Sequence, residues 1–302
     1  IMVSASHNPP EDNGIKIFDD NGLKINTKVQ TFIESQLKTN EFTNDITKNN
    51  NDYGNSYYKN DILKYYRNEL IASVTGRNLT GVNIVLDLCC GSTTAFGEDI
   101  FKELGANLII INGTADGNLI NVKCGSTHLD PLKEKVIETN ADMGFAFDGD
   151  GDRMLAIDGE GRVIDGDHIL YLWGKELQEA NELPQERIVC TIMSNLGFEK
   201  AWKARGGILE RTDVGDQNVH SEMLSKGATL GGEQSGHILS SKNRYCGDGL
   251  LTALQIATIC HSKKMTLSQW RNQSFNPFPQ KLINVPFPKS IAYKKIRDSK
   301  FI

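Results

Sequence analysis

The stretch that decides the fold is Asp148-Gly149-Asp150-Gly151-Asp152-Arg153. It lies between two apolar runs, Met143 to Phe147 and Met154 to Ile157, which we interpret as short strands on either side of a tight loop. Residues two apart in an extended backbone point to the same side, so the three aspartates can converge, while the glycines allow a sharp turn. The stretch therefore predicts a cation-binding loop at the end of a strand.

The charge of this loop requires compensation. Carboxylates 4 Å apart repel one another by roughly 4 kcal/mol per pair at an effective dielectric constant of about 20. Oxygen ligands without a nearby Cys or His favour Mg²⁺, Mn²⁺ or Ca²⁺ over zinc or copper. The alternative is a solvated acidic turn in which Arg153 neutralises one carboxylate. The repeated Asp-Gly pattern at a strand end favours the metal site.

An EF-hand also begins with aspartates at alternate positions, but the pattern fails here. Its sixth position requires Gly and is Arg153, and its twelfth requires Glu and is Gly159. The flanking runs also predict strands, whereas an EF-hand needs helices. A calcium-binding structural protein remains an alternative that rests on the aspartate repeat alone.

Strands and helices alternate on both sides of the acidic loop. Before it we predict strands at Val82–Leu88 and Ala106–Ile111 and helices at Ala95–Leu104 and Leu132–Thr139. After it we predict helices at Ile169–Glu179, Gly197–Arg205, Asn218–Leu224 and Gly249–Cys260, and strands at Arg187–Ile192, Gly207–Glu210 and Thr229–Leu230. This order predicts an α/β fold of tandem three-layer α/β/α domains with mixed, mainly parallel sheets. Ligands gather at the carboxyl ends of strands in such sheets, where the acidic loop lies.

The two ends of the chain predict smaller units. Near the start we expect a strand at Ile15–Phe18, helices at Val29–Leu37 and within Tyr57–Val74, and a linker at Asn40–Asn60. Near the end, four prolines mark a boundary and Lys281–Val285 predicts the first strand of a further unit. We expect a fragment of a longer protein, with domains at 1–58, 59–164, 165–275 and 276–302.

The composition bounds the class of protein. The chain has 302 residues, of which 24% are charged and 39% hydrophobic, and its length allows two or three domains. A net charge of −5 argues against nucleic acid or an anionic membrane as the main partner. The sequence contains no run of about 18 apolar residues, so we predict no transmembrane helix. The six cysteines lack CxxC spacing, so we expect reduced, mostly buried thiols and a cytoplasmic location.

The loop from Ser4 to Pro10 holds the candidate nucleophile, Ser6. In isolation Ser6 and His7 could be ordinary loop residues that cap a turn. Acyl transfer is a poor fit, because the chain has no Gly-x-Ser-x-Gly elbow. Phosphoryl transfer fits better, since it needs a hydroxyl, a cation and a proton carrier, which Ser6, the acidic loop, and Lys16 or His7 could supply.

The loop from Gly231 to His237 is the candidate recognition element. Its glycines allow close approach of the backbone, and the Glu233 carboxylate beside a hydroxyl can accept hydrogen bonds from neighbouring sugar hydroxyls. The alternative is a Gly-rich turn in which Glu233 is solvated. The density of Gly, Glu, Gln, Ser and His favours recognition.

These three loops, in this order and at these separations, resemble the motifs of the α-D-phosphohexomutase superfamily. The stretches Ile120–His128, Gly231–His237 and Gly247–Gly249 are most similar to the phosphoglucosamine mutase family. The resemblance extends from Ile1 to about Pro288. It implies a bacterial, cytoplasmic intramolecular phosphotransferase that interconverts glucosamine 6-phosphate and glucosamine 1-phosphate and supplies UDP-N-acetylglucosamine for cell-wall (peptidoglycan) synthesis.

The resemblance also implies the roles of the site residues. Ser6 would carry the phosphoryl group as a phosphoserine, and Mg²⁺ would be bound by Ser6, Asp148, Asp150 and Asp152. His7 and Lys16 would assist proton transfer, and Arg153 would orient the loop or the phosphate. The sugar hydroxyls would be held by Glu233 and Ser235, with His237 nearby. A 1,6-bisphosphate would be the intermediate, and glucosamine or glucose 1,6-bisphosphate the activator.

The chain departs from the superfamily pattern at several places. It lacks the Arg-Ser-Gly-Thr phosphate-binding loop of the last domain and the start of the first domain. Leu88-Cys89-Cys90 replace the usual Cys-Ala-Asn, and Asp213, Gln217 and Asn218 stand where the glucosamine enzymes usually have Lys, Arg and Tyr. We therefore expect the fragment alone to be poorly active. The alternatives are a phosphoglucomutase or phosphomannomutase and a non-catalytic sugar-phosphate binder. The expected partner is a hexose phosphate, with a possible homodimer.

Overall fold

A computed structural model describes residues 1–20, 22–38, 54–241 and 245–283 of the chain. The strand before the acidic loop, β5 (Met143–Phe147), lies at the centre of a five-stranded mixed sheet of order β4-β3-β5-β6-β7. Its other strands are β3 (Asn83–Asp87), β4 (Asn107–Ile111), β6 (Met154–Asp158) and β7 (Val163–Ile164). The pairings β4/β3 and β3/β5 are parallel, and β5/β6 and β6/β7 are antiparallel. The acidic loop is the short connection of the β5/β6 hairpin.

A second mixed sheet of four strands follows in the order β11-β10-β8-β9. It is made of β8 (Arg187–Thr191), β9 (Ile208–Thr212), β10 (Leu230–Gly232) and β11 (Ile238–Ser240). The strands β9, β8 and β10 run parallel, while β11 returns antiparallel to β10. The connection between β10 and β11 carries Glu233, which places this loop at the carboxyl end of a parallel strand.

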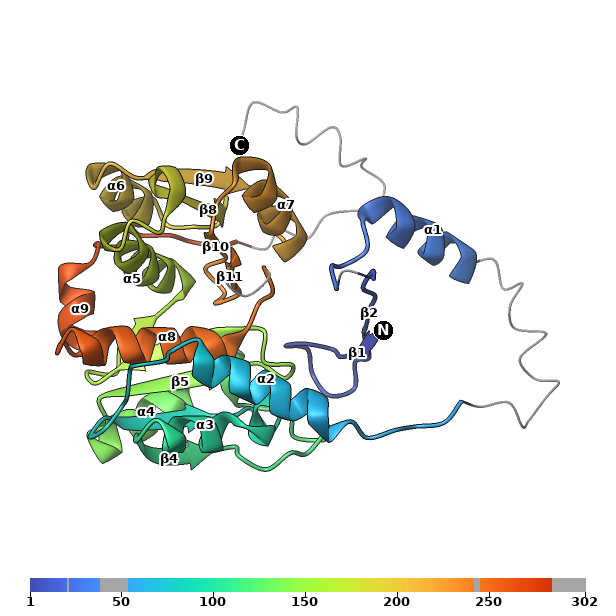
Figure 1. Cartoon of the computed structure of the whole chain (residues 1–302), viewed down its shortest axis with the longest axis horizontal. Coiled ribbons are helices and arrows are strands. Elements are labelled where there is room, and N and C mark those ends of the chain that lie inside the picture. The colour runs from blue at the N-terminus through green and yellow to red at the C-terminus, as the bar shows by residue number, and fades with distance from the viewer. Residues whose placement is uncertain (21, 39–53, 242–244, 284–302) are drawn as a thin grey trace.

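Helices cover both sheets (Figure 1). Around the first sheet lie α2 (Asn60–Ala72), α3 (Gly97–Glu103) and α4 (Asp130–Thr139), and around the second lie α5 (Gly166–Glu179), α6 (Leu196–Ala204) and α7 (Asp216–Lys226). α4 contacts β3, β5 and β6, whereas α5 and α7 contact β10. Among the fully described elements, short 3₁₀ turns lie at Ser92–Ala95, Gly125–Thr127 and Pro184–Glu186.

The helix α8 (Gly249–Ser262) joins the two sheets into one body. It contacts β5 and β6 of the first sheet and α5 of the second unit, and its side chains are buried nearly all round. A helix that is apolar on every face is stable only when it is enclosed. One continuous hydrophobic core therefore runs from Leu70 on α2 to Phe275 after α9 (Leu267–Gln273).

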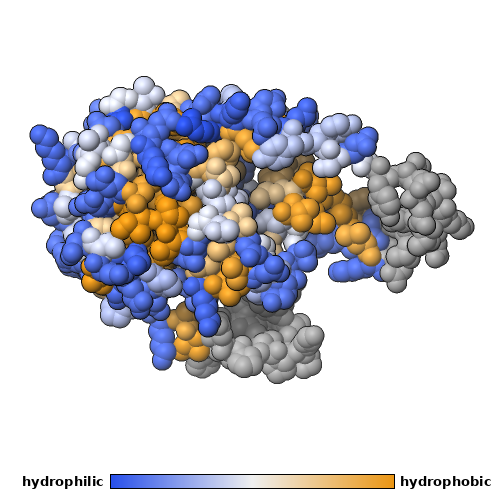
Figure 2. Space-filling model, turned by 90° about the horizontal axis from the view of Figure 1, so that it is seen from below, coloured by the Kyte–Doolittle hydropathy of each residue, from blue (hydrophilic) through white to orange (hydrophobic). Residues whose placement is uncertain are grey.

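The N-terminal unit is a smaller structure beside this body. The two short strands β1 (Met2–Val3) and β2 (Ile15–Lys16) pair antiparallel, and α1 (Thr27–Leu37) follows, capped by Asn26. α1 has no buried residue, and Ile1, Val3, Ile15 and Phe32 are exposed. On the face shown in Figure 2, apolar residues form separate patches within a largely hydrophilic surface.

The predicted α/β architecture is confirmed, with differences at short elements. The expected helix Ala95–Leu104 is interrupted, because Phe96 has φ −143° between a 3₁₀ turn and α3. The pattern did not predict β7, β11 or α9. The strand expected at Lys281–Val285 is wrong for residues 281–283, which form no strand, and its other residues lie outside the described part. Most of the linker expected at Asn40–Asn60 also lies outside it, and the four domain boundaries stay predictions.

Two further expectations concern the class of protein. Five of the six free cysteines are buried and Cys246 is exposed, as the apolar runs predicted. Among the helices of the described residues, we find none with both the length and the apolar character that a membrane crossing requires.

Candidate active site

The three aspartates of the acidic loop converge as predicted. One carboxylate oxygen from each of Asp148, Asp150 and Asp152 lies within 4.8 Å of the others. Asp148 is fully buried at the end of β5, and Gly151 has φ +74°, a conformation that glycine adopts without strain. A Cβ at Gly149 would lie 2.6 Å from the carbonyl oxygen of Ser6. The glycines thus let the acidic loop turn and let the Ser6 backbone approach it.

Ser6 lies directly against this carboxylate cluster. Its Oγ donates a hydrogen bond to Asp148 Oδ2 at 3.1 Å and lies 3.3 Å from His7 Nδ1. Its backbone N–H donates to Ser4 Oγ at 2.9 Å, and Ser4 Oγ in turn donates to Asp150 Oδ2 at 2.9 Å. Ser6 has φ +53°, which costs a non-glycine residue about 1 kcal/mol or more and is typical of functional loops. The chain holds this hydroxyl in place against a local strain.

Lys16 reaches the same cluster from β2. Its Nζ lies 2.6 Å from Asp150 Oδ2 and 2.9 Å from Asp152 Oδ2. Burial alone would lower the pKa of Lys16, but the hydrogen bonds to Asp150 and Asp152 outweigh it and raise this pKa. The ammonium group therefore stays charged and partly neutralises the aspartates.

The remaining charge of the cluster is unbalanced. Burial, followed by the charges of Asp152 and Asp150, raises the pKa of Asp148 to about 8. Burial has the same tendency at Asp150, yet hydrogen bonds from Lys16 and Ser4 hold the pKa of Asp150 below its usual range. Within the described part of the chain, the buried Oδ1 atoms of Asp150 and Asp152 have no hydrogen-bond partner. Orphaned carboxylate oxygens that converge with a third carboxylate fit a hard divalent cation such as Mg²⁺.

His7 and Arg153 flank the serine. Burial and then the charge of Arg153 lower the pKa of His7, so the neutral ring beside Ser6 Oγ can accept a proton at neutral pH. The backbone N–H of Arg153 donates to Asp148 Oδ1 at 3.0 Å. Its buried Nε finds no partner among the described residues, which leaves a donor free for an anion.

The loop between β10 and β11 meets the acidic loop from the second sheet. His237 Nδ1 lies 3.7 Å from Asp152 Oδ1, and burial lowers the pKa of His237. A Cβ at Gly236, where φ is +91°, would lie 2.3 Å from the carbonyl oxygen of Met154, so this position requires glycine. The two predicted loops are therefore in backbone contact.

Glu233 and Ser235 lie differently from one another. Glu233 is buried, and its Oε1 accepts a hydrogen bond from the N–H of Gly215 at 3.0 Å. Ser235 is exposed. The predicted residue Glu233 thus also fixes the loop that begins α7.

Comparison with known proteins agrees with this arrangement. The family model of phosphoglucomutase/phosphomannomutase α/β/α domain I matches residues 1–44, that of domain II residues 58–161, and that of domain III residues 165–278. The chain belongs to the phosphoglucomutase/phosphomannomutase family. The Ser6, Asp148–Asp152 and Glu233 loops lie in the regions matched by domains I, II and III of this family, respectively.

Similar members of the family are described as phosphoglucosamine mutases. A protein of Prochlorococcus marinus is 58% identical over 299 residues, which are 99% of this chain and 64% of that protein. The protein of Synechococcus sp. (strain CC9902) is 54% identical over 97% of this chain and 63% of its own length. The chain thus spans less than two thirds of the curated relatives it matches.

Solved structures of the family share the fold. A phosphoglucomutase/phosphomannomutase family protein of Burkholderia thailandensis has a TM-score of 0.72 and 25% identity, and the match covers 89% of this chain and 57% of that one. The N-acetylphosphoglucosamine mutase of Aspergillus fumigatus, in complex with GlcNAc-6P and magnesium, has a TM-score of 0.67 and 18% identity over 92% of this chain and 73% of its own.

In this chain, a cavity of about 400 Å³ opens beside the carboxylate cluster of the acidic loop. It lies between the N-terminal unit and the second sheet, and its lining includes Lys16, Asp150, Asp152 and His237. Glu233 and Ser235 are not among the described residues that line this cavity. The structure therefore brings four of the ten predicted residues to the wall of one cavity. The other six do not line it: Ser6, His7, Asp148, Arg153, Glu233 and Ser235.

The sequence pattern missed several residues of this region. Lys24 and Asp216 line the cavity and form an ion pair between the N-terminal unit and α7. Asn121 donates from its Nδ2 to the carbonyl oxygens of Ser6 at 2.7 Å and Asn8 at 2.9 Å, which fixes the serine loop on the first sheet. Asn121 belongs to the Ile120–His128 stretch that indicated the family, and this was its only signal in the sequence.

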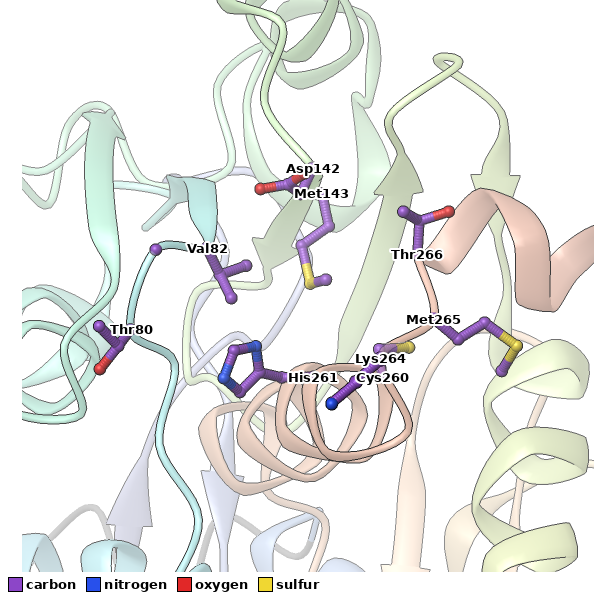
Figure 3. A pocket seen from close by; sticks show the side chains of 10 residues that line it. Thr80, Val82, Asp142, Met143, Cys260, His261, Lys264, Met265 and Thr266 are labelled. Carbon is purple, nitrogen blue, oxygen red and sulfur yellow. The ribbon is translucent and has the colours of Figure 1, made fainter.

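A second cavity, of about 340 Å³, lies at the opposite end of the first sheet (Figure 3). It is lined by Thr80 and Val82 before β3, by Met143 at the start of β5, and by His261 and Lys264 near the end of α8. The acidic loop follows the other end of β5. Because ligands of α/β sheets bind beyond the carboxyl ends of the strands, this cavity is not part of the site.

Proposed function

We propose that the protein to which this chain belongs is a phosphoglucosamine mutase, and that this chain carries its phosphoserine, metal and sugar-recognition loops. The observation that carries the proposal is the contact of 3.1 Å between Ser6 Oγ and Asp148 Oδ2 within the aspartate cluster. The names of relatives at 54–58% identity support the choice of glucosamine as the sugar. The reaction interconverts glucosamine 6-phosphate and glucosamine 1-phosphate.

Ser6 is the residue that carries the phosphoryl group. In the first transfer, O1 of glucosamine 6-phosphate attacks the phosphorus on Ser6, the bond from phosphorus to Ser6 Oγ breaks, and the 1,6-bisphosphate forms. After the sugar turns over, Ser6 Oγ attacks the 6-phosphoryl group, and the bond from phosphorus to O6 breaks. The product is glucosamine 1-phosphate, and Ser6 is phosphorylated again.

Each transfer also moves one proton between a sugar hydroxyl and the protein. His7 is 3.3 Å from Ser6 Oγ and has a lowered pKa, so it can accept a proton there. Lys16 holds its proton firmly and can stabilise developing negative charge on the sugar oxygen. The free Nε donor of Arg153 is available for a phosphoryl oxygen.

Asp148, Asp150 and Asp152 would hold Mg²⁺ together with an oxygen of Ser6, since their converging and partly orphaned oxygens fit this ion. When bound, Mg²⁺ neutralises charge on the transferred phosphoryl group. A phosphoserine adds about −1.5 to −2 charges, which three carboxylates could not otherwise accommodate. The Aspergillus relative, crystallised with GlcNAc-6P and magnesium, is consistent with this assignment.

The sugar binds in the 400 Å³ cavity, where it must be accepted in two opposed orientations. The loop between β10 and β11 contributes His237 to the wall of this cavity. Glu233 and Ser235 of the same loop lie outside the wall, and we propose that they contact adjacent ring hydroxyls once a sugar is bound. Because Glu233 Oε1 is occupied by Gly215, its other carboxylate oxygen would contact the sugar. Gln217 and Asn218, which depart from the family pattern, line the same cavity and can influence the choice of sugar.

The test uses the full-length protein that contains this chain. With Mg²⁺ and a trace of glucose 1,6-bisphosphate as activator, it should convert glucosamine 6-phosphate with a higher kcat/KM than glucose or mannose 6-phosphate. Intact-mass analysis should find one phosphate on the wild type and none on Ser6→Ala. No conversion of glucosamine 6-phosphate under these conditions would exclude the proposal.

Three finer assignments belong to this proposal. We expect the full-length protein to act in the cytoplasm, to supply the precursor of UDP-N-acetylglucosamine, and to form a homodimer. Light scattering of the full-length protein measures the dimer directly, and a monomer at micromolar concentration would contradict it.

A further inference from the structure

Two buried thiols lie in contact behind the Ser6 loop. Cys89 is in the turn after β3, and Cys124 precedes the 3₁₀ turn Gly125–Thr127. Their Sγ atoms are 3.9 Å apart, and both side chains are almost fully buried. A disulfide requires the sulfur atoms to approach from 3.9 Å to about 2.05 Å, so the bond needs a local rearrangement of these two turns.

The backbone around both thiols is fixed by one carboxylate. Asp87 Oδ1 accepts a hydrogen bond from the N–H of Cys89 at 3.1 Å, and Asp87 Oδ2 accepts one from the N–H of Gly125 at 2.8 Å. Gly125 has φ +69°, and a Cβ there would lie 2.4 Å from Cys89 Sγ. This glycine and the shared carboxylate keep the two sulfur atoms adjacent.

The thiol pair is connected to the nucleophile loop through one side chain. Cys89 Sγ donates to Asn121 Oδ1 at 3.1 Å, and the same amide donates from Nδ2 to the carbonyl oxygens of Ser6 and Asn8. Asn121 is buried, so few other hydrogen-bond partners are available to its side-chain amide. Any change at Cys89 therefore reaches the Ser6 backbone through a single intervening residue.

We propose that Cys89 and Cys124 form a reversible disulfide, and that this bond loosens the Ser6 loop by removing the thiol donor of Asn121. With hydrogen peroxide as oxidant, the Cys124 thiolate attacks one peroxide oxygen and hydroxide leaves, which gives a sulfenic acid. The Cys89 sulfur then attacks Cys124 Sγ, and the oxygen leaves as water. Overall two thiols and one peroxide give one disulfide and two waters, and a dithiol reductant reverses the bond by exchange.

The two thiols differ in their readiness to react. The contact between the two sulfur atoms lowers the pKa of Cys124, while the same contact and burial raise the pKa of Cys89. Cys124 is therefore the thiol that ionises first. Both are closed to solvent, so oxidation requires local opening of residues 113–128, where Leu119 and Val122 are exposed and the one regular element is a 3₁₀ turn.

Cys90 is the natural competitor, because it follows Cys89 in the same turn and is also buried. Cys246 is exposed and would react first with any oxidant. The experiment therefore uses the full-length protein in a Cys246→Ser background, with and without Cys90→Ser. Mild hydrogen peroxide is followed by alkylation and peptide mapping without reductant.

The expected result is a linked peptide pair containing residues 89 and 124, two hydrogen atoms lighter than the reduced peptides, in both backgrounds, and its loss after dithiothreitol. A link from Cys90 to Cys124, or only sulfinic acid at these positions, would overturn the proposal. The disulfide does not depend on the mutase activity, so this outcome is distinct from that of the proposed function.

Matched variants test the effect on the Ser6 loop. Cys89→Ser keeps a donor for Asn121 but cannot form the disulfide, and Cys89→Ala removes the donor. Hydrogen exchange of amides 4–14 should rise about threefold on oxidation of the parent protein and in Cys89→Ala without oxidant. The exchange rate of these amides in Cys89→Ser should equal that of the reduced parent protein and should not change when peroxide is added. Unchanged exchange in the oxidised parent would refute the coupling to the loop.

Discussion

The body of the molecule and its N-terminal unit are stabilised in different ways. In the body, two sheets enclose α8 and share one apolar core. In the unit of residues 1–38, α1 buries no side chain and β1 is exposed. Among the described residues, its polar contacts with the body include hydrogen bonds and ion pairs of Ser4, Ser6, Lys16 and Lys24, and Asn121 of the body donates to the Ser6 backbone.

This difference separates stability from chemistry. The proposed nucleophile lies on the unit that contributes little apolar burial, whereas the three aspartates proposed to bind the metal lie on the body. Moderate ionic strength screens exposed ion pairs but does not screen hydrophobic burial, which carries no charge. Substitutions in the unit should therefore change activity more than the free energy of unfolding, and substitutions in the core should do the reverse.

The largest expected effect is that of Ser6→Ala on turnover. Removing the nucleophile of a covalent mechanism costs about 10⁴-fold or more in kcat. The free energy of unfolding should change by no more than about 0.5 kcal/mol, as for a surface substitution, because Ser6 contributes no apolar burial. The matched control is Ser35→Ala on α1, which should keep full activity. Turnover of Ser6→Ala above about 1% of wild type would show that another residue carries the phosphoryl group.

The second effect concerns the core alone. Phe101 is fully buried and packs against Phe145 with ring centroids 6.0 Å apart. Phe101→Ala should lower the free energy of unfolding in urea by about 3–5 kcal/mol. Phe32→Ala on α1, where the side chain is 64% exposed, should change it by less than about 0.5 kcal/mol. An equal loss of unfolding free energy in Phe101→Ala and Phe32→Ala would contradict the proposed difference between the body and the N-terminal unit.

The third effect is expected at the junction of the two regions. Lys16→Met removes the ammonium group that contacts Asp150 and Asp152, so kcat should fall about 10²-fold. Residues 1–38 should also become more sensitive to protease. Lys28→Met, at an exposed position of α1, serves as the control and should behave like the wild type. The role of Lys16 is disproved if both variants retain equal kcat.

The fourth effect is a pH dependence. The pKa of Asp148 is raised to about 8 in the folded chain, so the folded state binds more protons than the unfolded state between about pH 4 and pH 8. In buffer without Mg²⁺, stability should therefore fall as the pH rises through this window. Added Mg²⁺ should raise the Tm, and more at pH 8 than at pH 5.

Asp148→Asn is the control for this dependence, because an amide does not titrate. Its Tm should vary less with pH and respond less to Mg²⁺, as differential scanning calorimetry can measure. A wild-type Tm that rises from pH 5 to pH 8 without Mg²⁺ would contradict the assignment.

The smallest effect is expected at the ion pair of Lys24 and Asp216, whose side chains are 30% and 26% exposed. Partly exposed pairs contribute about 1 kcal/mol or less. Lys24→Met should raise KM about threefold at low salt and less at high salt. A double-mutant cycle with Asp216→Asn measures the coupling between the two side chains. Zero coupling at low salt would show that this pair does not hold the unit to the body.

The sequence predicted the features that depend on neighbouring residues. Alternation placed Asp148, Asp150 and Asp152 on one side of a loop, and the apolar run predicted β5 with its observed bounds. Short elements were missed for a physical reason. Strands β7 and β11 have two and three residues, too few to show alternation, and α9 is a single capped segment of seven residues.

Contacts between distant segments could not be predicted in this way. Asn121 is 115 residues from Ser6, and Lys24 is 192 residues from Asp216. No local pattern relates such pairs, because the fold alone brings them together. Cys89 and Cys124 belong to the same class, since each is an ordinary buried thiol until the turn after β3 meets the segment before Gly125.

The position of α8 has a consequence for the order in which the protein is made. This helix is among the last elements of the body along the chain, yet it covers β5 and β6 of the first sheet, and the N–H of Gly249 donates to the carbonyl oxygen of Gly151 in the acidic loop. During synthesis, one apolar face of the first sheet therefore stays uncovered until about a hundred further residues, up to α8, have been made. The acidic loop can therefore reach its final form only after the residues of α8 have emerged from the ribosome.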